Sequence, residues 1–61
     1  MPMTRFYFRD AEISSRATKP GDASLDPGTR MEVDGRTYEI SAVSPDPATG
    51  DIKIGLRAIA S

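Results

Sequence analysis

Residues 29–43 alternate between apolar and polar side chains and are interrupted once, by Asp34-Gly35. A period of two residues is the pattern of a β-strand, and Asp-Gly supplies the two positive φ angles that a two-residue hairpin turn requires. The register that follows pairs Val33 with Arg36, Glu32 with Thr37, Met31 with Tyr38, and Arg30 with Glu39. Apolar residues then meet on one face and opposite charges meet on the other, so the sequence predicts a β-hairpin over residues 29–43.

Two further segments have the same period. In residues 4–9 two phenylalanines share one face, and residues 51–59 carry Ile52, Ile54 and Leu56 on one face. Gly55 falls on the other face and indicates a bulge, a bend or the close approach of another backbone. The predicted inward residues are Phe6, Phe8, Met31, Val33, Tyr38, Ile40, Val43, Ile52, Ile54 and Leu56.

The segment between the first strand and the hairpin has no such period. Residues 14–28 contain two Pro-Gly pairs and one large apolar side chain, Leu25, which predicts an extended loop. Residues 10–15 contain one large apolar residue, Ile13, so the sequence does not decide whether they form a short second strand. Helix is expected as a short turn at most, because no window has a 3.6-residue period.

Together these segments predict an all-β fold. We expect one domain over residues 1–61, a small twisted antiparallel sheet of three to five strands, either open or rolled into an SH3-like or OB-like barrel. Its parts are an N-terminal strand or arm at 1–9, an extended loop at 14–28, a β-hairpin at 29–43 and a final strand at 51–59. Such a sheet leaves an edge or a seam free to pair with another chain.

Composition excludes most kinds of chemistry. The chain has no His and no Cys, which removes thiolate metal sites, disulfides and the commonest general base. We therefore expect a protein that is not an enzyme and has no cofactor. The acidic residues Asp34, Asp46 and Asp51 lie in or beside turns, where Asp normally bonds its own backbone, and no metal site is expected.

Charge argues against general nucleic-acid binding. The formal net charge is −1, whereas such proteins are usually strongly basic. The feature that most favours nucleic-acid binding is a basic stripe on the outer face, formed by Arg5, Tyr7, Arg9, Lys53 and Arg57. Glu12, Glu32 and Glu39 could neutralise this stripe. Nucleic acid is thus an improbable partner, and with no long apolar run we expect no membrane association and no secretory signal.

Small size favours association with other proteins. A 61-residue chain buries a small core, and without disulfides or metals oligomerisation is the remaining common source of stability. Tyr and Arg are also enriched at interface hot spots. The residues expected to form a protein interface, with the first strand and the loop reaching neighbouring subunits, are Arg5, Tyr7, Arg9, Arg16, Lys19, Leu25 and Arg57.

About half of the chain resembles a known family. The pattern Gly-Thr-Arg-Met-Glu-Val-Asp-Gly-Arg-Thr-Tyr-Glu-Ile-Ser-Ala-Val, then a turn and Ile-Lys-Ile-Gly-Leu, is similar to the hairpin core of head-completion and head–tail joining proteins of tailed bacteriophages. The resemblance implies a non-enzymatic subunit of a virion, made in the host cytoplasm. Because family members are generally longer, a capsid-decorating or tail-accessory subunit is a further reading. A small regulatory protein that inhibits one host target is the alternative, and such a protein would be cytoplasmic.

Overall fold

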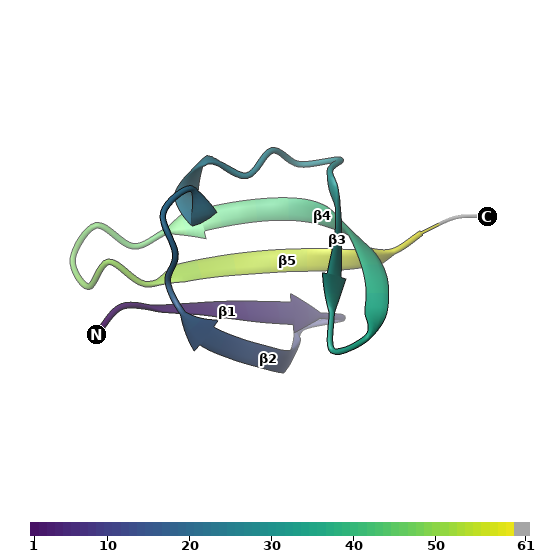
Figure 1. The fold of residues 1–61 in the computed structure, drawn as a ribbon, viewed down its shortest axis with the longest axis horizontal. Coiled ribbons are helices and arrows are strands. Elements are labelled where there is room, and N and C mark those ends of the chain that lie inside the picture. Colours follow the sequence, from purple (N-terminus) through teal and green to yellow (C-terminus); the bar gives the residue numbers. More distant parts are fainter. Residues whose placement is uncertain (60–61) are drawn as a thin grey trace.

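The computed structural model describes residues 1–59 and contains one five-stranded sheet (Figure 1). A single turn of 3-10 helix, η1, lies in the connection between the second and third strands. The elements are β1 (Met3–Phe8), β2 (Ala11–Ala17), η1 (Asp22–Ser24), β3 (Arg30–Val33), β4 (Arg36–Pro45) and β5 (Ile52–Ala58). The all-β class and the near absence of helix are therefore confirmed.

The strands lie in the order β2-β1-β5-β4-β3, and the sheet curls into a half-barrel. The pairs β1–β2, β3–β4 and β4–β5 are antiparallel, whereas β1 and β5 run parallel, from Thr4 beside Ile52 to Phe8 beside Leu56. The sheet is thus mixed rather than wholly antiparallel. The reason is that β1 and β5 come from opposite ends of the sequence and no hairpin sets their direction.

The predicted hairpin is confirmed in its register. Met31 pairs with Tyr38 and Arg30 with Glu39, as the alternation requires. The turn residues Asp34 and Gly35 have φ angles of 52° and 81°, which fits the two positive values of a two-residue hairpin turn. Local turn chemistry alone therefore fixes β3 against β4.

The core lies on the inner face of the half-barrel. Its buried residues are Phe6, Val33, Ile40, Ile52, Ile54 and Leu56, with Phe8, Ile13, Leu25, Met31, Tyr38 and Val43 packed around them. All ten residues predicted to point inward belong to this cluster. Ile13 and Leu25 are additions, and the rings of Phe8 and Tyr38 meet at 5.3 Å between centroids.

Gly55 lies opposite an irregularity in β4. The register of β4 against β5 shifts between Ile40 and Ala42, so Ser41 is an extra residue there. A Cβ built on Gly55 would stand 3.0 Å from Ser41 Oγ, which explains why this strand position is a glycine. The bulge also lets Ile40 and Val43, three residues apart, both reach the core.

Two expectations for the N-terminal half are wrong. Residues 14–17 belong to strand β2 rather than to an extended loop, and of the two alternatives for residues 1–9 the structure shows the strand, paired on both sides, so that the role of a reaching arm is wrong. The turn that joins β1 to β2 uses Arg9 and Asp10 at φ 53° and 65°, without the glycine that usually marks such a turn. A register shift beside Ile13 then breaks the alternation that would have identified β2.

The remaining boundaries differ little from expectation. The last strand is Ile52–Ala58, one residue shorter at each end than residues 51–59. Within residues 1–59, no helix is long and apolar enough to cross a membrane.

Candidate functional site

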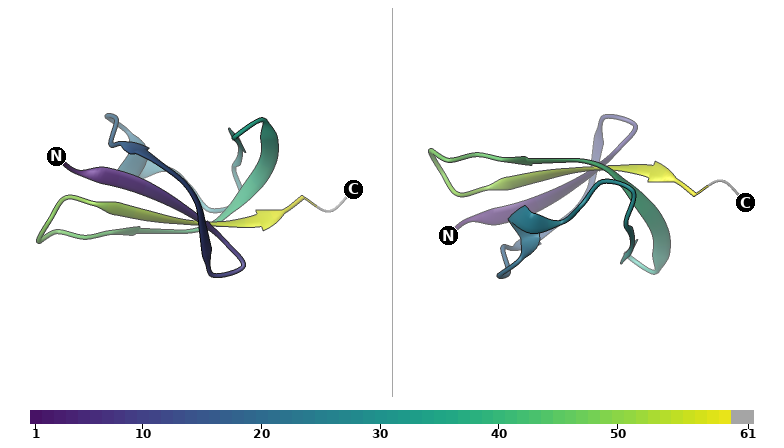
Figure 2. Two further views of the ribbon diagram at one scale, coloured as in Figure 1. Left: turned by 90° about the horizontal axis from the view of Figure 1, so that it is seen from below. Right: turned by 90° about the horizontal axis from the view of Figure 1, so that it is seen from above.

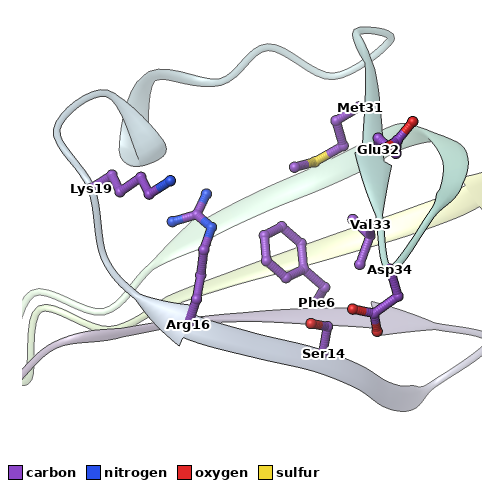
Figure 3. Close-up of a pocket in the computed structure, with 8 residues that line it drawn as sticks. All are labelled: Phe6, Ser14, Arg16, Lys19, Met31, Glu32, Val33 and Asp34. Carbon is purple, nitrogen blue, oxygen red and sulfur yellow. The ribbon is translucent and has the colours of Figure 1, made fainter.

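A groove of about 350 Å³ opens on the inner face of the half-barrel, where the sheet stops short of closure. Figure 3 shows the groove with the Phe6 ring inside it, Arg16 and Lys19 on one side, and Met31 and Val33 of β3 on the other. Figure 2 shows that η1 and β3 lie on the same side of the layer formed by β1, β5 and β4. The connection containing η1 and the edge strand β3 thus face each other across the groove.

A buried carboxylate organises the wall that carries Arg16. Asp22 is 6% exposed and receives hydrogen bonds from Arg16 through both terminal nitrogens, Nη1 at 2.7 Å and Nη2 at 3.0 Å. The Thr4 hydroxyl donates to Asp22 Oδ2 at 2.8 Å, and the backbone N–H of Lys19 donates to the same oxygen at 2.9 Å. Thr4 is fully buried and also lies 3.0 Å from the hydroxyl of Thr18. We call Thr4, Arg16, Thr18, Lys19 and Asp22 the Asp22 cluster.

These contacts decide the protonation state of the cluster. The hydrogen bonds from Arg16 hold the pKa of Asp22 well below its usual range, assisted by the Lys19 N–H and the Thr4 hydroxyl, although burial acts in the opposite direction. The same contact with Asp22 raises the pKa of Arg16. The guanidinium also lies over the Phe6 ring, 5.4 Å from its centroid. The cluster therefore fixes the connection after β2 onto the inner face of the sheet.

The opposite wall of the groove is the edge strand β3. Met31 turns its side chain into the groove beside Val33; Glu32 and Asp34 also border the groove, with the Glu32 carboxylate directed away from Phe6 (Figure 3). Neither Arg30 nor Glu32 forms an ion pair or a side-chain hydrogen bond with another residue of the described chain. Glu39 lies opposite Arg30 on β4, but its carboxylate pairs with Arg57 instead. Both charges on β3 thus remain available to a partner.

The outer face carries a second group of the predicted interface residues. Arg5 forms ion pairs with Glu12 at 3.4 Å and with Asp51 at 3.1 Å. The Met3 backbone N–H and then Arg5 lower the pKa of Asp51. The Lys53 ammonium lies over the Tyr7 ring, 4.8 Å from its centroid. The expected basic stripe is thus largely paired with carboxylates or an aromatic ring.

The predicted interface residues are therefore divided among separate places. Arg5 and Tyr7 lie on the outer face, and Arg57 on that face pairs with Glu39. Arg16 and Lys19 border the groove. Arg9 lies in the β1–β2 turn with its guanidinium 5.2 Å from the centroid of Phe8.

Two of these residues differ from the expectation in their environment. Arg16 was expected in a loop but lies on β2 and points inward, because the strand continues to Ala17. Leu25 was expected as an anchor for a neighbour, but it packs against the core of its own chain, because the Asp22 cluster holds the connection onto the sheet.

The Asp22 cluster itself was not predicted, and one signal could have indicated it. Thr4 shares the inward side of β1 with Phe6 and Phe8, and a polar side chain at an inward position needs a hydrogen-bond partner. The partner could not be found from the pattern, because Asp22 lies in the irregular connection. Every buried side-chain nitrogen and oxygen in residues 1–59 has a hydrogen-bond partner.

The described residues include several carboxylates in and beside turns. They contain no group of three or more His, Cys, Asp or Glu placed to hold a metal ion. Asp46 accepts a hydrogen bond from the Ala48 backbone N–H at 2.9 Å, the turn role expected for it. A scan against protein-family models, a search of curated proteins and a search of solved structures each returned no match. The function is therefore argued from the groove and the strands around it.

Proposed function

We propose that this protein is a non-catalytic structural subunit that joins a larger protein assembly through the groove and the edge strands beside it. The observation that carries the proposal is the unclosed half-barrel. In the described chain β2 and β3 each have a neighbour on one side only, and they border a groove that reaches Phe6 and Val33 of the core. Free strand edges beside apolar side chains favour pairing with a segment of another chain.

The resemblance of residues 29–56 to phage head-completion and head–tail joining proteins suggests the kind of assembly. A bacteriophage virion is the assembly that we propose, with the protein as a capsid-decorating, head-completion or tail-accessory subunit. Nucleic acid is a weaker candidate partner, because Arg5 and Arg57 already pair with carboxylates and the net charge is −1.

Sedimentation and mass spectrometry of the protein from the cells that produce it test the proposal. We expect many copies in a large particle with symmetric subunits. A free monomer, or a one-to-one complex with a single target, would replace the structural role with the regulatory alternative.

A matched pair of variants tests the role of the groove in the same particle. Ser14 lines the groove, whereas the neighbouring Ser15 lies on the outer side of β2. Ser14→Trp should fill the space beside Phe6 and prevent incorporation, and Ser15→Trp should be incorporated as the unchanged protein is. Equal incorporation of both folded variants would contradict a role for the groove.

A further inference from the structure

The geometry points to β3 as the docking edge, and to a partner segment that adds a sixth strand antiparallel to it with the sequence order basic–apolar–acidic. This inference rests on the proposed function and names the partner's chemistry. It follows from the direction of the free backbone groups of β3, from its unpaired charges, and from the side chain that β3 turns into the groove.

The backbone of β3 offers donors and acceptors at two residues. Ile40 donates its backbone N–H to the Thr29 carbonyl at 2.8 Å, and hydrogen-bonded and non-hydrogen-bonded pairs alternate along an antiparallel ladder. The Thr29 carbonyl and the backbone groups of residues 31 and 33 therefore point toward β4, whereas the Thr29 N–H bonds the Asp26 carbonyl. The backbone groups of Arg30 and Glu32 point away from β4, toward the open edge, where an added strand can bond them.

The side chains of the same two residues specify which strand fits. Arg30 and Glu32 lie on the outer face and flank Met31, which lies on the groove side. Cross-strand neighbours of opposite charge stabilise a sheet, and like charges destabilise it. An antiparallel partner meets Glu32 first and Arg30 two residues later, so it needs a basic residue, then an apolar residue, then an acidic one.

The apolar residue of that order faces Met31 and enters the groove. There it packs beside the partly exposed Met31 and reaches the small exposed parts of Phe6 and Val33, which are otherwise buried in the core. The segment Arg30-Met31-Glu32 has the same order itself, so a second copy of the chain is the competing occupant. We favour a single inserted strand, because Ser14 and Arg16 of β2, together with Lys19, border the groove opposite β3 and so bound the space beside β3 on both sides.

Two synthetic nonapeptides test the inference. The first is Thr-Val-Thr-Lys-Val-Glu-Thr-Val-Thr, and the second has the Lys and Glu exchanged. Titration of the ¹⁵N-labelled full chain should shift the amide signals of β3 and of the groove. The first peptide should bind about tenfold more tightly, since two opposite-charge pairs replace two like-charge pairs. In the double variant Arg30→Glu/Glu32→Arg the preference should invert.

Proline variants identify which edge is used. Thr18 donates its N–H to the Pro2 carbonyl at 3.1 Å, so alternation directs the N–H of Ser15 away from β1. Glu32→Pro removes an outward N–H from the β3 edge, and Ser15→Pro removes one from the β2 edge, where proline is tolerated. Peptide binding should be lost in the first variant and kept in the second.

Three results, besides a complete absence of binding, would overturn the inference. They are equal binding of both peptides, loss of binding in Ser15→Pro alone, and a wild-type dimer whose β3 signals change with protein concentration. The first two leave the proposed function standing if the protein is still recovered in a large particle. No binding of either peptide at millimolar concentration would also overturn this inference, whereas the proposed function fails only on the copy-number measurement.

Discussion

Replacing Asp22 tests whether the cluster around it holds the connection after β2 onto the sheet. Asp22→Ala removes four hydrogen bonds, two from Arg16 and one each from Thr4 and Lys19. Breaking a buried ion pair by removing one partner costs about 3–5 kcal/mol. The lower end applies, because the Arg16 side chain is 32% exposed and can regain water. The Thr4 hydroxyl also keeps a partner in Thr18.

The expected loss is therefore about 3 kcal/mol for Asp22→Ala, and about 2 kcal/mol for Asp22→Asn, which retains an oxygen acceptor. A chain of this length has a free energy of unfolding of about 3–9 kcal/mol at roughly 0.05–0.15 kcal/mol per residue. The hydrogen bonds of Asp22 thus account for a large share of the free energy of unfolding. Urea unfolding at pH 7 measures it, and with a slope near 1 kcal/mol/M we expect the midpoint to fall by about 2–3 M.

The pH dependence of the unfolding free energy shows how much of the contribution of Asp22 comes from its negative charge. Because the pKa of Asp22 is lowered in the folded state, its contribution is complete above the unfolded value near 3.9, and it is lost as the pH falls toward the folded pKa. The difference in unfolding free energy between the unchanged protein and Asp22→Asn should therefore shrink below about pH 4. A difference under about 0.5 kcal/mol at pH 7, or one that does not change with pH, would refute the reasoning.

Three further substitutions test the packing of the sheet. Gly55→Ala should lower the free energy of unfolding by about 1–3 kcal/mol in thermal or urea unfolding, because the new Cβ would stand 3.0 Å from Ser41 Oγ. The loss should be smaller in a Ser41→Ala background, and an equal loss in both backgrounds would contradict this contact. Ile54→Ala should lower the free energy of unfolding by about 2–5 kcal/mol, because Ile54 is fully buried; a loss below about 1 kcal/mol would contradict the assigned core. Arg57→Met should change stability by less than about 1 kcal/mol in the same assay, because its side chain is 61% exposed, and a larger loss would mean that its pair with Glu39 matters more than surface pairs usually do.

Alternation predicted the elements that repeat regularly, and its failures occur where the repeat is broken. The turn and register of the hairpin at Asp34-Gly35 were predicted to the residue, since both follow from local chemistry, whereas β4 continues to Pro45, beyond the predicted end at residue 43. Strand β2 was left undecided over residues 10–15 and its end at Ala17 was assigned to a loop, because its turn contains Arg9 and Asp10 instead of glycine and because the register shifts beside Ile13. The parallel pairing of β1 with β5 could not be predicted from the sequence either, because no short connection joins these two strands and sets their relative direction.

The groove could not be predicted from the sequence for a related reason. Lys19 and Met31 were visible as separate residues, but they border one groove only because the connection after β2 returns to the inner face. That return depends on Asp22, a polar residue in an irregular segment that no periodicity identifies. The free charges of Arg30 and Glu32 were likewise hidden, because the register pairs Arg30 with Glu39 and only the structure places Arg57 closer to that carboxylate.

Stability and binding should therefore respond to different residues in this half-barrel. The Asp22 cluster holds one wall of the groove in place, so Asp22→Asn should weaken the fold and peptide binding together. Arg30 and Glu32 form no ion pair in the described chain, so exchanging their charges should alter which peptide binds at a cost of no more than about 1 kcal/mol, which comes from placing a glutamate opposite Glu39. A double variant with both changes should then show additive losses in stability but the inverted peptide preference of the charge exchange, because no side-chain hydrogen bond or ion pair joins the two groups in residues 1–59.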